Sequence, residues 1–266
     1  MKKYFAVPLA VLFVAACSDS TAPVNSRSDL TPSYAKPLPP PPAGATGTAY
    51  TDSYDFNSVS VVNAAHSAIG VDTDDGSIAS SGSETQSVPS DPSNGFIGRY
   101  NNTNTRALLV LTTAGSKYTV SFDLYVIGSW DGKGKQAQNG VFQANVFQVG
   151  YRCGGGTAAV TPIFSTTFSN QLTVQQDFPL SLGLGGYKAT TGAASVDNLG
   201  YASRPDLSNT PTFRSFGDAT YKLSYTIAGV CGGAAPTFVF SSTAPGQQSN
   251  YDESWGLDNI VIKADT

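Results

Sequence analysis

The sequence predicts an all-β protein, built as an antiparallel sandwich or barrel. Three observations support this fold class. Apolar and polar residues alternate in several short runs after residue 50, glycine and proline separate these runs, and no segment repeats its apolar residues with the helical period of 3.6. With 27 glycines and 16 prolines in 266 residues, short strands joined by turns are the expected outcome.

The strongest strand signal lies at residues 117–126, where every second residue from Tyr118 to Val126 is large and apolar. Such an alternation places one face of a strand against a core and the other in water. Further strands are predicted at 106–111, 141–149, 221–227, 238–240 and 260–262. The stretch 71–94 is polar, so we expect a long loop there with at most one short strand.

The N-terminus has the pattern of a secretory signal peptide over residues 1–16. Two lysines precede an uncharged run, which is too short to span a bilayer and ends in Val14-Ala15-Ala16-Cys17. This ending resembles the bacterial lipobox, which implies that Cys17 is acylated and becomes the new N-terminus. The alternative is an ordinary signal peptide cut near Ala16, with Cys17 incidental.

Residues 17–48 are predicted to be a disordered linker, because their proline, serine and threonine content cannot bury a core. The run 37–42 contains five prolines and favours an extended spacer. Residues 49–266 then form one domain, held off the membrane by this tether. Because Ser18 rather than aspartate follows Cys17, we expect anchoring in the outer membrane, facing away from the cytoplasm.

Charge composition argues against nucleic-acid binding. Loss of Lys2 and Lys3 with the signal peptide leaves 13 basic and 19 acidic residues, a net charge of −6 (13 − 19), and no basic cluster is present.

Two cysteines besides Cys17 remain, Cys153 and Cys231, each at the start of a glycine-rich turn. In an oxidising compartment an even pair predicts a disulfide, and two free thiols are the alternative.

Two segments carry a resemblance to a family of secreted bacterial jelly-roll domains. Residues 122–132 read FDLYVIGSWDG and residues 252–262 read DESWGLDNIVI; the shorter runs FIGRY at 96–100 and TFSN at 167–170 fit the same family. The resemblance implies an antiparallel jelly-roll β-sandwich from about residue 50 to the end. The family is mostly uncharacterised, occurs on surface lipoproteins, and is similar to carbohydrate-binding and concanavalin-like sandwiches.

A structural calcium ion is the cofactor expected from this reading. By strict alternation Asp258 shares a face with Ile260 and Ile262, so its carboxylate points inward and needs a partner. Jelly-roll carbohydrate modules often clamp the closing strand with calcium, which takes oxygen ligands. The resemblance then implies Asn57 as a second ligand, in place of the usual acidic residue. Asp131 and Glu253 are alternative ligands if their two loops meet.

Trp130, Trp255 and Tyr100 are the candidate ligand-binding residues, because sugar-binding proteins stack sugar rings on exposed aromatic side chains. The alternative is that the tryptophans, each close to a glycine in a strand-edge motif, pack at the end of the sandwich. Exposed rings around a groove would favour a sugar ligand, and buried rings would favour a scaffold.

No catalytic residues are predicted. A glycosidase needs two carboxylates at a set distance, and the chain has only two glutamates, Glu84 and Glu253. A serine hydrolase needs a base, and His66 is the sole histidine, with no G-x-S-x-G motif in the chain. The sequence therefore predicts a non-catalytic, membrane-anchored surface module that binds glycan through a face of the sandwich. The alternative is a structural or adhesive envelope protein that contacts another protein.

Overall fold

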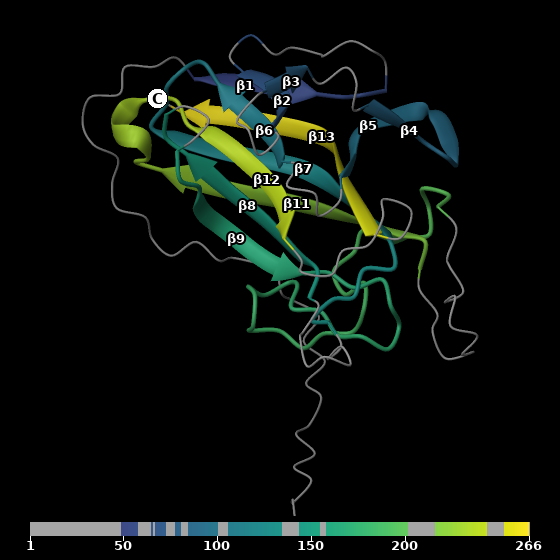
Figure 1. Cartoon of the computed structure of the whole chain (residues 1–266). Coiled ribbons are helices and arrows are strands. Elements are labelled where there is room, and N and C mark those ends of the chain that lie inside the picture. The colour runs from purple at the N-terminus through teal and green to yellow at the C-terminus, as the bar shows by residue number, and fades with distance from the viewer. Residues whose placement is uncertain are drawn as a thin grey trace, which may run out of the picture. The chain divides into compact units, whose positions relative to one another are not determined.

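Two antiparallel β-sheets pack face to face in the computed structural model, which describes residues 49–57, 65, 67–72, 78–80, 85–100, 106–134, 144–154, 158–201, 216–243 and 253–265. Figure 1 shows the two layers. The described residues belong to a unit that spans residues 35–266. The signal peptide, the linker and Cys17 lie outside the described residues, as do His66 and Glu84.

The first sheet, called sheet A, has the strand order β10-β11-β7-β13-β5-β4, and β1 pairs with β13. Its strands are β1 (Tyr50–Tyr54), β4 (Thr85–Val88), β5 (Asp91–Tyr100), β7 (Lys117–Gly128), β10 (Ser195–Val196), β11 (Asp218–Ala228) and β13 (Glu253–Asp265). The second sheet, sheet B, has the order β3-β2-β6-β12-β8-β9. Its strands are β2 (Ser67–Asp72), β3 (Ile78–Ser80), β6 (Arg106–Leu111), β8 (Val146–Arg152), β9 (Thr161–Thr167) and β12 (Thr237–Thr243).

Eight of these strands follow a jelly-roll path. Along the chain β5, β7, β11 and β13 lie in sheet A, and β6, β8, β9 and β12 lie in sheet B, with the spatial orders β11-β7-β13-β5 and β6-β12-β8-β9. The chain thus crosses repeatedly between the sheets, as in a double Greek key. The all-β prediction and the jelly-roll sandwich are confirmed, and the barrel alternative is wrong.

The core between the sheets is formed by the alternating apolar residues that the sequence indicates. On β7, Tyr118, Val120, Phe122, Leu124 and Val126 are all buried. They face the buried residues Phe147, Phe238 and Phe240 of sheet B, and the ring centroids of Phe122 and Phe240 lie 5.0 Å apart. Burial of this apolar face is the main stabilising contribution to the sandwich.

The prediction of a long loop at residues 71–94 is wrong. This stretch contains the end of β2, all of β3 and β4, and the start of β5. Strands β3 and β4 lie at sheet edges, and Thr85, Gln86 and Ser87 of β4 are exposed. An edge strand with exposed side chains needs few apolar residues, so the alternation that reveals a half-buried strand is missing there.

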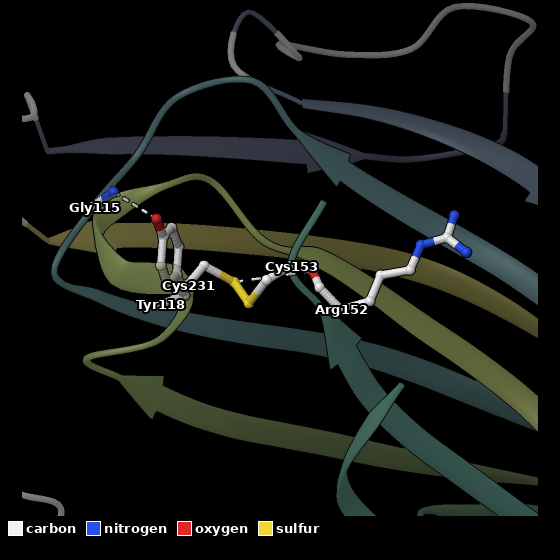
Figure 2. The surroundings of a disulfide bond; sticks show 5 residues. All are labelled: Gly115, Tyr118, Arg152, Cys153 and Cys231. Carbon is white, nitrogen blue, oxygen red and sulfur yellow. Dashed lines mark hydrogen bonds between the residues drawn. A yellow bond between two sulfur atoms is a disulfide. The ribbon is translucent and has the colours of Figure 1, made fainter. Parts of the chain in front are cut away.

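The predicted disulfide between Cys153 and Cys231 is present, with a Cα–Cα distance of 5.1 Å. Figure 2 shows it joining the end of β8 to the turn between β11 and β12, beside Tyr118 of β7. Cys231 has a φ of +57°, and Gly232 and Gly233 continue the left-handed turn. The glycines next to the cysteines thus allow the tight turn that brings the two sulfurs together.

A long segment between β9 and β10, residues 168–194, closes one end of the sandwich and is named the end loop. In Figure 1 it forms the green loops below β9. Its backbone is tied to other elements: the Asn170 N–H donates to the Trp130 carbonyl at 3.0 Å, and the Leu182 N–H donates to the Ser165 carbonyl at 2.7 Å. Across the part of the chain that the structure describes, no helix is long and apolar enough to cross a membrane.

Candidate functional site

The tryptophans and Tyr100 are buried, which favours the alternative of packing within the sandwich over contact with a ligand. Trp130 and Trp255 have 0% of their surface exposed and Tyr100 has 3%. The Trp255 ring packs against Tyr100, with centroids 4.9 Å apart, and its indole N–H donates to Ser242 Oγ at 2.9 Å. The Trp130 indole N–H donates to the Ser254 carbonyl at 2.9 Å. Both rings serve the alternative role, packing within the sandwich.

Asp258 does not point into the main core, contrary to the sequence prediction. A β-bulge in β13 between Asp258 and Val261 adds one residue against β7, and Asn259 adopts a φ of +49° there. An added residue reverses the alternation of side chains. Asp258 therefore lies opposite Asp123 on the outer face of sheet A, whereas Ile260 and Ile262 face the core.

Asp258 is nevertheless buried, because side chains cover this part of the outer face. The Tyr125 hydroxyl donates to its Oδ2 at 2.8 Å, and the Asn259 backbone N–H donates to its Oδ1 at 2.7 Å. Burial raises the pKa of Asp258, an effect that these hydrogen bonds oppose and the nearby carboxylates of Asp55 and Asp123 reinforce. Asp258 thus has protein donors on both oxygens.

Each of the four predicted calcium ligands contacts other groups of the protein. Asn57 is exposed, and its Oδ1 accepts a hydrogen bond from the Gly95 N–H at 2.9 Å. Asp131 and Glu253 are both bound by one residue, although the bond to Asp131 involves its backbone N–H and not its carboxylate. Asn145 links them, since its Oδ1 accepts from the Asp131 N–H and its Nδ2 donates to Glu253 Oε2 at 2.9 Å. Within the described ranges, no three acidic, histidine or cysteine side chains are grouped so as to hold a metal ion.

A second feature of sheet A is a row of polar side chains across four strands, three of them hydroxylated. Thr51 of β1 lies opposite Lys263 of β13, Lys263 opposite Thr119 of β7, and Thr119 opposite Thr226 of β11. All four alternate with core residues along their strands and so face outward. The Thr119 and Thr226 hydroxyls are hydrogen-bonded at 2.9 Å.

A parallel row lies two residues further along each strand. It consists of Ser53, Val261, Ser121 and Ser224, and the Ser121 and Ser224 hydroxyls are 2.8 Å apart. We name these two rows together the hydroxyl face. Strand geometry sets its spacings at about 4.8 Å between strands and about 6.7 Å along them.

The hydroxyl face is nearly neutral and lies between two ion pairs. Lys117 pairs with Asp265 at one end, and Lys222 pairs with Asp123 at the other, with Nζ 2.9 Å from Oδ2. Within the two rows Lys263 is the one charged side chain. Thr51, Ser224, Thr226 and Lys263 are exposed, and Ser53, Thr119, Ser121 and Val261 are half-buried. The face therefore offers hydroxyl donors and acceptors at regular intervals with little net charge.

The end loop carries the most exposed large apolar side chains of the described residues: Leu172 at 50%, Leu182 at 47% and Leu184 at 71%. Several of its polar side chains, by contrast, are buried. Gln176 is fully buried, and its Oε1 accepts from the N–H groups of Ser169 and Thr190 at 3.0 and 3.1 Å. The end loop is thus fixed from inside by polar contacts and presents leucines outside.

Neither the hydroxyl face nor the exposed leucines were predicted from the sequence. The serine and threonine positions in 117–126 and 221–227 were a usable signal, because they alternate with apolar residues in both strands. Their alignment into rows depends on the register between neighbouring strands, which cannot be derived from the sequence of a single strand. The run Leu180-Ser181-Leu182-Gly183-Leu184 looks like a half-buried strand, yet the structure forms a turn there.

Comparison with protein-family models finds no match for this chain, and comparison with curated proteins finds none either. The family resemblance of residues 122–132 and 252–262 accordingly remains an interpretation of the sequence.

Proposed function

We propose that this protein is a non-catalytic module, anchored to the cell envelope by lipid on Cys17 in the outer membrane, that binds a neutral polysaccharide through its hydroxyl face. The observation that carries the proposal is the alignment of six serine and threonine side chains in two rows across four strands. Hydroxyl groups donate and accept hydrogen bonds, as the hydroxyls of a glycan do. The near-neutral charge of the face suits an uncharged polymer.

This binding mode replaces the aromatic stacking expected from the sequence. An extended polymer lying across the hydroxyl face meets several hydroxyls at once, so many weak contacts add along its length. The cross-strand hydroxyl pairs use one donor and one acceptor each, which leaves further lone pairs and one proton per pair for a ligand.

The hydrogen bonds of two buried carboxylates, Asp218 and Asp258, support the proposal that the protein is not an enzyme. Asp218 accepts backbone N–H groups of Asn198 and Leu199 at 3.0 and 3.1 Å, and Asp258 accepts from Tyr125 and Asn259. Although burial raises the pKa of both acids, each is engaged by protein donors that hold loops and a bulge in place. Their shifted pKa values are thus explained by structural roles.

Affinity electrophoresis tests the proposal. The chain from Ser18 to Thr266, which lacks the acylated Cys17 and so carries no lipid, is run through gels containing neutral and charged polysaccharides. We expect retardation by at least one neutral polymer and loss of this retardation in Ser121→Arg, which places a bulky charge in the middle of the face. Thr161→Arg, at an exposed position of β9 in the other sheet, is the matched control and should migrate like the wild type. Unchanged melting temperatures show that both variants are folded.

A structural or adhesive role with a protein partner is the second candidate, and the burial of both tryptophans favours it. It predicts no retardation of the wild type on any polysaccharide in the panel. It also predicts that a photo-crosslinking residue at Ser224 captures one specific envelope protein in intact cells, whereas the same residue at Thr161 does not. Retardation that depends on Ser121 contradicts this second candidate.

A further inference from the structure

The turn Ser181–Leu184 within the end loop, named the leucine turn, exposes two apolar side chains that lie two positions apart in the sequence. Leu184 has 71% of its surface exposed and Leu182 has 47%. The turn is closed by a hydrogen bond of 3.0 Å from the Leu184 N–H to the Ser181 carbonyl. Single exposed apolar side chains are common on soluble proteins; here two lie on one turn of fixed shape, within an uncharged stretch of chain, and form a candidate contact site for an apolar surface.

Buried polar contacts fix the turn in this exposed position. The Asp177 side chain is 2% exposed and accepts hydrogen bonds of 3.0 Å from the N–H groups of both Gly183 and Gly185. The Leu182 N–H donates to the Ser165 carbonyl on β9 at 2.7 Å. Gly185 packs so closely on Asp177 that a Cβ there would lie 2.1 Å from its carbonyl oxygen. The leucines therefore cannot fold back onto the sandwich without breaking these contacts.

The leucine turn lies in an uncharged stretch of chain that is bordered by lysines, a pattern that allows close approach to a membrane. Residues 178–187 contain no charged side chain. Asp177, at the start of this stretch, is buried against Lys133, whose Nζ lies 3.2 Å from its Oδ1. Lys188, at the end of the stretch, is exposed. An apolar tip with lysines at its base resembles in chemistry the interfacial elements that bury apolar side chains among lipid headgroups.

A protein partner fits this turn less well. Hot spots of protein interfaces are enriched in tryptophan, tyrosine and arginine, and leucine is under-represented among them. Residues 179–186 consist of proline, leucine, serine and glycine only. A membrane, by contrast, is the surface to which the proposed lipid on Cys17 would hold the domain. The tether from Cys17 to Thr48 has 32 residues (48 − 16). At roughly 3 Å per extended residue it lets any side of the domain reach the bilayer.

We propose that the leucine turn rests in the surface of the bilayer to which Cys17 is anchored, with Leu182 and Leu184 inserted among the lipid headgroups. The inference rests on the lipid anchor of the proposed function. Two leucines alone give a weak contact, but the tether keeps the turn at high effective concentration beside the membrane, so a weak contact is sufficient. The turn then sets which side of the domain faces the bilayer.

Quenching by nitroxide-labelled lipids tests the contact. The acylated chain is reconstituted in vesicles of phosphatidylethanolamine and phosphatidylglycerol, with a fluorophore at Ser181→Cys, which leaves both leucines in place. The control fluorophore is at Thr161→Cys, exposed on β9. We expect quenching at position 181 to exceed that at position 161 at least threefold. Adding Leu182→Ser and Leu184→Ser should reduce it to the level at 161. Leu184→Ser alone should give an intermediate value, and Leu172→Ser should have no effect.

A second measurement separates this inference from the anchor itself. The chain from Ser18 to Thr266 carries no acyl group, and we expect it to cosediment weakly with the same vesicles, at least fivefold more than its Leu182→Ser/Leu184→Ser variant. Mass spectrometry of the N-terminal peptide reports acylation of Cys17 independently. Equal quenching at positions 181 and 161 would overturn the inference, whether or not Cys17 is acylated. So would vesicle binding that does not depend on the two leucines.

Discussion

Lys133 and Asp177 form an ion pair at the base of the end loop, with Lys133 Nζ 3.2 Å from Asp177 Oδ1. Asp177 is buried, and Lys133 also donates to the Gly185 carbonyl at 2.7 Å. Burial by itself raises the pKa of Asp177, but the Gly183 N–H, Lys133 and the Gly185 N–H together outweigh it and lower the pKa below its ordinary value of 3.8. One carboxylate thus joins the leucine turn to a loop that follows β7.

Substitution of Asp177 should destabilise the protein. In Asp177→Asn one of the carboxylate oxygens becomes an amide group that cannot accept a hydrogen bond, so a buried backbone N–H is left unpaired. We expect the free energy of unfolding to fall by about 2 kcal/mol at neutral pH. Because the folded-state pKa of Asp177 is lowered, its contribution is present above pH 3.8 and is lost as the pH falls through the folded-state pKa.

Urea denaturation of wild type and Asp177→Asn between pH 2.5 and 7 measures this effect. Asp91→Asn, at a fully exposed aspartate, is the control and should change stability little. A stability difference that is the same at both ends of the pH range would contradict the role assigned to Asp177.

Asp258 should show the opposite dependence on pH. Its pKa is raised, chiefly by burial, so the folded protein binds a proton more readily than the unfolded chain. The difference in free energy of unfolding between wild type and Asp258→Asn, taken as wild type minus variant, should fall as the pH rises from 3.8 through the folded-state pKa. Carboxylates that do not interact with Asp258 contribute equally to both proteins and cancel in this difference. Denaturant titrations at several pH values check the sign, and a difference that increases over this range would contradict it.

The Cys153–Cys231 disulfide closes a loop with a sequence separation of 78. In the chain-entropy description, a loop of this size stabilises the folded state by about 4 kcal/mol. We expect reduction to lower the melting temperature substantially, and Cys153→Ser/Cys231→Ser to melt at the temperature of the reduced wild type. Reductant should leave the melting temperature of that double variant unchanged. A melting temperature of the wild type that is insensitive to reductant would show that the crosslink does not stabilise the fold.

Calcium remains a prediction that one experiment can test. Asp131 and Glu253 are two of the expected ligands, and Asn145 contacts the Asp131 backbone N–H and the Glu253 carboxylate. If calcium binds there, the melting temperature rises between EDTA and millimolar calcium, and Glu253→Gln abolishes the rise. Asn57→Ala is the control, because Asn57 contacts Gly95 and lies at another site. Equal melting temperatures in EDTA and calcium would refute the calcium prediction.

The sequence predicted the sandwich from local pattern but missed its edges. Strand β7 was evident because burial of one face imposes alternation on its residues. Strand β4 was missed because an edge strand with exposed side chains has no such constraint. The disulfide was predictable from the pairing rule for cysteines. The orientation of Asp258 was not, because a single bulge at Asn259 reverses the alternation and leaves no mark in the apolar pattern of β13.

The sequence by itself determined the strands of the core, the pairing of Cys153 with Cys231, and the low charge of the chain. Burial of one face of a strand leaves an alternating pattern within that strand, and the number of cysteines and charges is read directly from the sequence. Only the tertiary structure decided which side chains are available to a ligand. It placed both tryptophans inside, aligned Thr119 with Thr226 and Ser121 with Ser224 on an outer face, and left Leu182 and Leu184 in water. The physical reason is that exposure depends on strand register and on what covers each face, and both are set by contacts between residues distant in sequence.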